Sequence, residues 1–219
     1  MSAWGLAVVI GVLMAGQQQP GRVDRMLIRQ VHAMVGDRGK LAELLLAPTD
    51  TGVIAAAAVL LVVIALVRRR WDVVVLAVAG PAIAVGLAEL VLKPVFDRRL
   101  YGLLSYPSGH AVASVAVYTV ATMALTSGAT RLWRRIAAAG WGLLTIVVMT
   151  GLVAMNCHYP TDTVGGVCVA VGVILPCALV SDTITHRHRA KVPIPMPRLR
   201  PAQGDRTGVR PVRSPRAQV

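Results

Sequence analysis

Long apolar runs constrain this chain more than any other feature of its sequence. Five runs have nearly the length of a membrane-spanning helix: residues 52–67, 73–92, 111–126, 137–155 and 163–181. Apolar runs that approach about 20 residues are typical of transmembrane helices. A shorter run from Ala3 to Ala15 is either a further span or a signal peptide cleaved between Ala15 and Gly16. The sequence therefore predicts an all-α, polytopic membrane bundle of about six transmembrane helices.

The charge pattern supports this prediction. Only 15% of the residues are charged, whereas about 25% is usual for a soluble domain. The net charge of +13 is spread over short clusters between the apolar runs, a pattern typical of membrane orientation signals. We therefore expect no nucleic-acid partner. The three cysteines fit no metal-binding spacing.

The basic clusters predict the orientation. With six spans, residues 68–70, residues 131–135 and the C-terminal residues share one side, which the positive-inside rule assigns to the cytoplasm. Residues 17–50, 93–109 and 156–162 then lie on the extracytoplasmic side. The first of these segments has apolar residues at roughly helical spacing with basic residues between them. The apolar residues are Met26, Leu27, Val31, Met34 and Val35, and the basic ones are Arg25, Arg29 and Arg38. This stretch is either an amphipathic helix on the membrane surface or a solvated connector.

Two regions follow from composition. Residues 1–184 form the predicted membrane domain, which we place in the cell (inner or plasma) membrane. Residues 185–219 are rich in Arg and Pro and predict a disordered cytoplasmic tail. The tail either binds anionic lipid head groups or serves only as a solvated orientation signal. The sequence gives no indication of the oligomeric state.

The hexapeptide Ser105 to His110 interrupts the apolar pattern. Ser108 can cap a helix that starts at about His110, which leaves backbone N–H groups free at the helix N-terminus. Such a terminus stabilises an anion, and a histidine there can exchange a proton near neutral pH. The alternative is a plain helix cap with a histidine at the membrane surface.

Two further segments lie on the same predicted face. Asp162 follows His158 by four residues, so its carboxylate can accept one ring N–H and leave the other nitrogen free to attack phosphorus. Alternatively, both residues have only local roles at the interface. The other segment, residues 93–99, carries three cations: Lys93, Arg98 and Arg99. They can hold phosphate oxygens, or they snorkel at the end of a span. Glu89 lies one turn before Lys93, and this spacing favours a structural ion pair.

Together these motifs resemble the phosphatidic acid phosphatase type 2 superfamily, also called the lipid phosphate phosphatases. The residues that carry the resemblance are Lys93, Pro107-Ser108-Gly109-His110, His158 and Asp162. The resemblance implies a phosphatase that needs no metal or cofactor and forms a covalent phosphohistidine. It implies that His158 is the nucleophile, Asp162 its orienting partner and His110 the general acid. Lys93, Ser108 and the Gly109 amide would bind phosphate.

The chain departs from the family pattern at two arginine positions. Leu100-Tyr101 stand where the first motif has Arg-Pro, and Gly151-Leu152 stand where the third has Ser-Arg. Arg98 or Arg99 could replace the first missing arginine, but the fifth span holds no replacement for the second. The expected substrate is a lipid phosphate or diphosphate, of the polyprenyl diphosphate, phosphatidic acid or phosphatidylglycerol phosphate type. The alternative is a catalytically impaired family member that binds or moves an anionic lipid.

Overall fold

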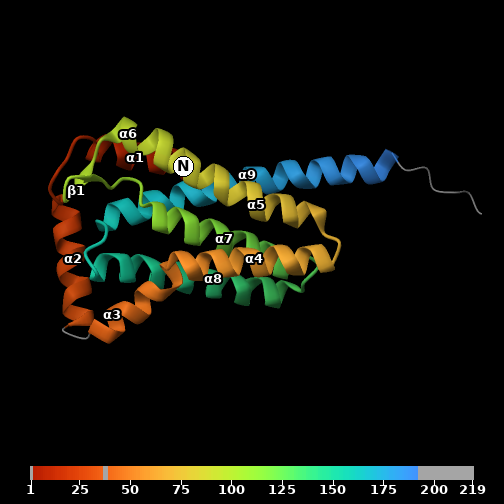
Figure 1. Ribbon diagram of the computed structural model, residues 1–219, viewed down its shortest axis with the longest axis horizontal. Coiled ribbons are helices and arrows are strands. Elements are labelled where there is room, and N and C mark those ends of the chain that lie inside the picture. Colours follow the sequence, from red (N-terminus) through yellow and green to blue (C-terminus); the bar gives the residue numbers. More distant parts are fainter. Residues whose placement is uncertain (1, 37–38, 192–219) are drawn as a thin grey trace, which may run out of the picture.

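A computed structural model of the protein describes residues 2–36 and 39–191, with side chains placed as far as residue 181. The described chain is almost entirely helical (Figure 1). Its elements are α1 (Ala3–Met14), α2 (Arg22–Val35), α3 (Gly39–Leu46), η1 (Ala47–Thr49), α4 (Thr51–Val67), α5 (Trp71–Leu87), the π-helical turn η2 (Ala88–Leu92), α6 (Lys93–Phe96), β1 (Arg99–Leu100), β2 (Leu103–Leu104), α7 (Gly109–Thr126), α8 (Arg131–Ala154) and α9 (Pro160–Lys191). The two short strands form one antiparallel hairpin.

Helix α7 occupies the centre of the bundle, where it packs against α4, α5, α8 and α9. The interior is made of small and β-branched residues such as Ala84, Val112 and Val169, all fully buried. Large apolar side chains point outward instead, among them Leu60 and Leu143. Exposed leucines are costly in water but not in lipid, so this distribution is that of a membrane-embedded bundle.

Among the described residues, five helical segments are long and apolar enough to cross a membrane: Gly39–Val67, Trp71–Phe96, Gly109–Thr126, Arg131–Ala154 and Pro160–Ser181. The predicted multi-pass helical membrane bundle is thereby confirmed. Helix α1 is apolar but has only 12 residues, which corresponds to about 18 Å against a hydrocarbon layer of about 30 Å. The expected sixth span at Ala3–Ala15 is therefore too short to cross the bilayer unaided.

The segment before the first long span folds into two helices that the sequence only partly predicts. Helix α2 lies across the end of the bundle, roughly perpendicular to the long helices (Figure 1). This orientation agrees with the predicted amphipathic surface helix, although Arg38 lies outside the described residues. The sequence pattern does not predict α3, which follows α2 and joins α4 through η1.

The last helix is longer than expected. Helix α9 passes Pro176 and continues to Lys191, whereas the sequence placed the end of the membrane domain at residue 184. Proline is tolerated within a buried transmembrane helix because neighbouring groups compensate for the lost hydrogen bond. The remainder of the expected tail, residues 192–219, lies outside the described residues.

The ends of the bundle can be assigned to membrane faces by cysteine labelling. Leu103 is exposed in the hairpin, while Arg134 follows the α7–α8 turn at the opposite end (Figure 1). In a variant lacking Cys157, Cys168 and Cys177, we expect Leu103→Cys to react with a membrane-impermeant maleimide in intact cells. Arg134→Cys should react only after permeabilisation, because the basic clusters favour the cytoplasm. Labelling of both from the same side would contradict this topology.

Candidate active site

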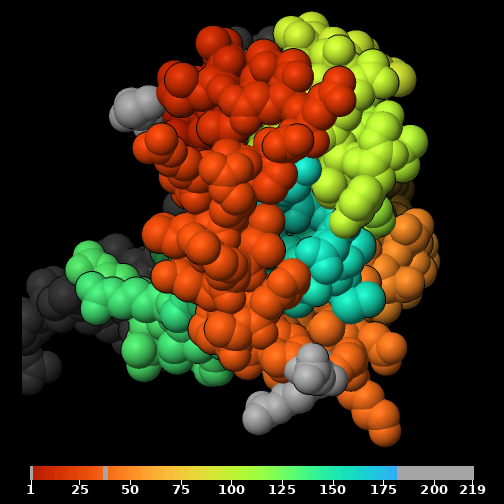
Figure 2. Space-filling view, turned by 90° about the vertical axis from the view of Figure 1, so that its left-hand side faces the viewer, coloured from red at the N-terminus to blue at the C-terminus, as the bar shows by residue number. Residues whose placement is uncertain are grey.

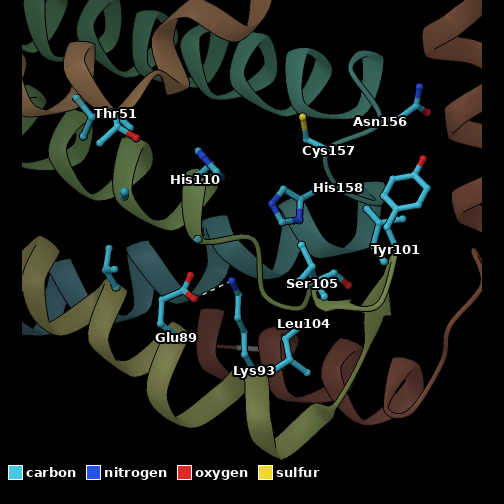
Figure 3. A pocket seen from close by; sticks show the side chains of 16 residues that line it. Thr51, Glu89, Lys93, Tyr101, Leu104, Ser105, His110, Asn156, Cys157 and His158 are labelled. Atoms are coloured by element: carbon cyan, nitrogen blue, oxygen red, sulfur yellow. Dashed lines mark hydrogen bonds and ion pairs between the residues drawn. The ribbon is translucent and has the colours of Figure 1, made fainter.

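A cavity of about 740 Å³ opens at the end of the bundle crossed by α2. In Figure 2, which faces this end, residues of the α8–α9 connection are visible between the N-terminal helices and the α5–α7 connection. The cavity is lined from η2, the hairpin, the start of α7 and the α8–α9 connection (Figure 3). Of the predicted site residues, four line it: Lys93, Gly109, His110 and His158.

The two histidines face each other across part of the cavity (Figure 3). Their ring centroids are 6.0 Å apart. His110 is exposed in the first turn of α7, while the side chain of His158 is only 11% exposed in the α8–α9 connection. This spacing places one sheltered and one accessible imidazole beside a common space, an arrangement suited to nucleophilic attack and proton donation at one substrate group.

The amino end of α7 forms as the sequence predicts. Ser108 is the N-cap, and its hydroxyl accepts a hydrogen bond from the Ala111 N–H. The Ser108 side chain is fully buried and does not line the cavity, so its hydroxyl serves the helix cap. Gly109 does line the cavity, and a Cβ atom there would overlap the Glu89 carboxylate. Among the predicted anion-binding groups of this loop, the helix end at Gly109 is thus the one that reaches the cavity.

Lys93 enters the cavity from the other wall. The π-helical turn η2 directly precedes it, and such turns are frequent at functional sites. Its Nζ lies 2.7 Å from Glu89 Oε2, which confirms the ion pair expected from their spacing. Among the described residues that line the cavity, Lys93 is the only lysine or arginine.

Arg98 has a different environment from the one we predicted. It does not line the cavity, and its side chain is completely buried. Its guanidinium lies 2.6 Å from Asp24 Oδ2 and 2.5 Å from Asp162 Oδ1, and it stacks over the Tyr159 ring at 4.6 Å. Two buried carboxylates therefore take up its charge, and the predicted contact of Arg98 with substrate phosphate stays a prediction.

Arg99 also lies away from the cavity. Its Nη2 atom is 2.8 Å from Asp97 Oδ1, and both side chains are about half exposed. Neither Arg98 nor Arg99 therefore lines the cavity, and the phosphate-binding role of Arg99 also stays a prediction. The positions of the missing arginines are apolar in the structure, with Leu100 on the cavity wall and Leu152 buried against Ala111 and Val148.

Asp162 lies close to His158 but does not hydrogen-bond to it. The distance from His158 Nδ1 to Asp162 Oδ2 is 4.0 Å, beyond hydrogen-bond reach. Asp162 instead accepts bonds from Arg98 and from the Tyr159 N–H, and His158 Nδ1 has no hydrogen-bond partner among the described residues. Catalytic hydrogen bonds are often long in unliganded sites, so the orienting role of Asp162 stays a prediction.

The surroundings of His158 keep its imidazole neutral. Burial lowers the pKa of His158 to about 4, and the positive charges of His110 and Lys93 act in the same direction. A backbone hydrogen bond to Ser105 opposes these effects. A neutral imidazole carries the lone pair that a nucleophile needs, so this environment is compatible with the predicted role of His158. Burial raises the pKa of the neighbouring Cys157 thiol, which disfavours a competing thiolate.

Sequence reasoning missed Asp24 and Thr161. Asp24 is fully buried, and its carboxylate accepts bonds from the Thr161 N–H and hydroxyl as well as from Arg98. The sequence does set Asp24 apart. It is the only acidic residue among residues 1–36, and it lies within a predicted basic amphipathic helix. Thr161 offered no such signal.

The comparisons with known proteins agree with this geometry. The sequence model of the PAP2 superfamily matches residues 93–185, a range that includes Lys93, Gly109 and both histidines. Over these residues the chain is similar to the PAP2 superfamily, and this match supports a phosphatase acting on phosphate esters. No curated protein and no solved structure matches the chain. In the described part of the chain, no three His, Cys, Asp or Glu side chains are grouped as metal ligands.

The buried Arg98 network makes a testable contribution to stability. Replacing Arg98 with alanine would leave Asp24 and Asp162 as uncompensated buried charges, which typically costs about 3–5 kcal/mol. We expect the Tm of the purified protein in detergent to fall by roughly 10 °C. Arg99→Ala is the matched control, since its exposed ion pair is worth at most about 1 kcal/mol. Equal Tm values for the two variants would contradict a structural role for Arg98.

Proposed function

We propose that this protein hydrolyses a phosphomonoester or diphosphate of a lipid through a phosphohistidine formed on His158. The observation that supports this proposal is the meeting of two histidines, one lysine and a helix N-terminus at one cavity. Asp162 is proposed to orient His158 during the reaction. The site would face the extracytoplasmic side of the membrane, and the reaction would need neither metal nor cofactor.

The proposed chemistry proceeds in two steps. A ring nitrogen of His158 forms a bond to phosphorus while the ester P–O bond breaks, and His110 donates a proton to the leaving oxygen. Water then attacks the phosphohistidine, giving its proton to His110, and the P–N bond breaks to release inorganic phosphate. Lys93 and the Gly109 N–H would stabilise the phosphoryl oxygens in both steps.

A second cavity supports a lipid as the substrate. It has a volume of about 520 Å³, is almost entirely apolar, and runs between α4, α5 and α7. It shares Thr51, Ile54 and Ala113 with the histidine cavity, so the two spaces adjoin. An apolar groove beside an anion site fits a phosphate that carries a hydrocarbon chain. A polyprenyl diphosphate, phosphatidic acid or phosphatidylglycerol phosphate would satisfy both parts.

Phosphate release by the purified protein tests the proposed function. We expect release from at least one of these lipid phosphates, with the same rate in EDTA. His158→Ala should abolish turnover, because no covalent intermediate can form. His110→Ala should lower turnover on lipids by about 10²–10⁴-fold, while Cys157→Ser, a neighbouring substitution, should retain most activity.

An inactive wild-type protein would overturn this proposal, as would wild-type turnover in His158→Ala. One observation favours the second candidate, a protein that binds or moves an anionic lipid without hydrolysing it. Lys93 is the single lysine or arginine among the described cavity-lining residues, so transition-state charge has less compensation than in the family pattern. Binding of a lipid phosphate by the wild-type protein without phosphate release would support this candidate.

The apolar groove can be tested separately with Ala58→Trp. Ala58 lines the groove but not the histidine cavity, so an indole there should obstruct a hydrocarbon chain and leave the phosphate site open. We expect kcat/KM to fall at least tenfold for a long-chain lipid phosphate and to change little for nitrophenyl phosphate. The control is Leu143→Trp on the outer face of α8, where the side chain is 64% exposed. Equal losses on both substrates would contradict a chain-binding groove.

A further inference from the structure

The carboxylate of Glu89 occupies an unusual position in the histidine cavity. Its Oε2 atom lies 2.7 Å from Lys93 Nζ. Its Oε1 atom lies so close to Gly109 that a Cβ atom there would overlap it. Gly109 is the first residue of α7, so the Glu89–Lys93 ion pair, drawn as a dashed line in Figure 3, lies beside the amino end of a helix.

This position has the properties that a phosphate group requires. A helix N-terminus and an ammonium group both stabilise negative charge. Lys93 and Gly109 line the same cavity as His110 and His158, which would act on the bound phosphoryl group. The cavity-lining part of the described chain offers no second lysine or arginine to which a phosphate could shift. A phosphate bound at this position would therefore compete with Glu89 for Lys93.

We propose that Glu89 is an internal anion that occupies the phosphate position in the unliganded protein and is displaced when the substrate binds. This inference rests on the proposed function and adds a residue that sets the affinity of the site for phosphate. Displacement is feasible because the Glu89 side chain is 39% exposed and borders an open cavity. The carboxylate moves aside, and Lys93 exchanges one anionic partner for another.

Competition predicts the direction in which phosphate affinity changes when Glu89 is altered. Phosphate binding is weakened by the free energy needed to separate Glu89 from Lys93. It is weakened further by repulsion between the phosphate and the nearby carboxylate. Removing the charge of Glu89 should therefore strengthen phosphate binding. If Glu89 served only to hold Lys93 in place, its neutralisation would release the lysine and weaken phosphate binding. The two roles thus predict opposite changes in one measured quantity.

Isothermal titration of inorganic phosphate into the full-length protein in detergent measures this quantity. At constant pH and ionic strength, we expect Glu89→Gln to lower the Kd of phosphate about tenfold, which is about 1.4 kcal/mol. Asp97→Asn removes the same charge from an exposed ion pair outside the cavity. It should change the Kd less than twofold. An unchanged or raised Kd in Glu89→Gln overturns the inference, and so does equal tightening in both variants.

Additional measurements separate failure of this inference from failure of the proposed function. Glu89→Ala should also bind phosphate more tightly, and Tm values of both Glu89 variants close to wild type would show that they fold. If lipid phosphates are not hydrolysed but Glu89→Gln binds phosphate more tightly, the function fails and the inference stands. If hydrolysis occurs without this gain in affinity, the inference alone fails. Absence of phosphate binding in the wild type and in Glu89→Gln overturns it as well.

Discussion

The buried guanidinium of Arg98 is the interaction on which the site end of this protein depends. It joins carboxylates that lie 74 and 64 residues away in the sequence, Asp24 in α2 and Asp162 in α9. None of the three side chains is exposed. A buried charge requires partners of good geometry, so the network fixes the surface helix, the α5–α7 connection and the start of α9 relative to one another. The position of His158, two residues before this start, follows from it.

Much of the architecture could be predicted because few backbone structures are stable within a lipid bilayer. A backbone in the bilayer must satisfy its hydrogen bonds internally, so long apolar runs become helices. The runs beginning near Gly52 and Ala111 did so with small shifts at their ends. Helix α3 was missed because its first residues are polar, and α9 continues past the predicted span, which ended at residue 181, because basic residues can extend a helix beyond the membrane. Composition indicates where lipid ends but does not indicate where a helix ends.

The candidate site was predictable in its parts but not in its contacts. Motif spacing placed Lys93, Gly109 and both histidines at one end of the bundle, and all four line one cavity. Spacing could not show that Arg98 points into the protein, because adjacent residues in a loop can face opposite ways. Motif spacing also could not predict the charge in the cavity, because this charge depends on the position of Glu89 beside Gly109. Two neighbouring arginines with identical chemistry thus have different surroundings, one buried between carboxylates and the other at the surface.

The backbone of α3 packs directly against Gly151, where a Cβ atom would overlap the main chain of Leu45 and Leu46. Gly151 and Leu152 stand at the positions where the family pattern has Ser-Arg. A serine at residue 151 would therefore displace α3, and an arginine at residue 152 would be buried in an apolar cluster. The two positions are therefore coupled through α3. A Ser-Arg pair cannot be introduced here one residue at a time, because the helix that covers these positions would first have to move.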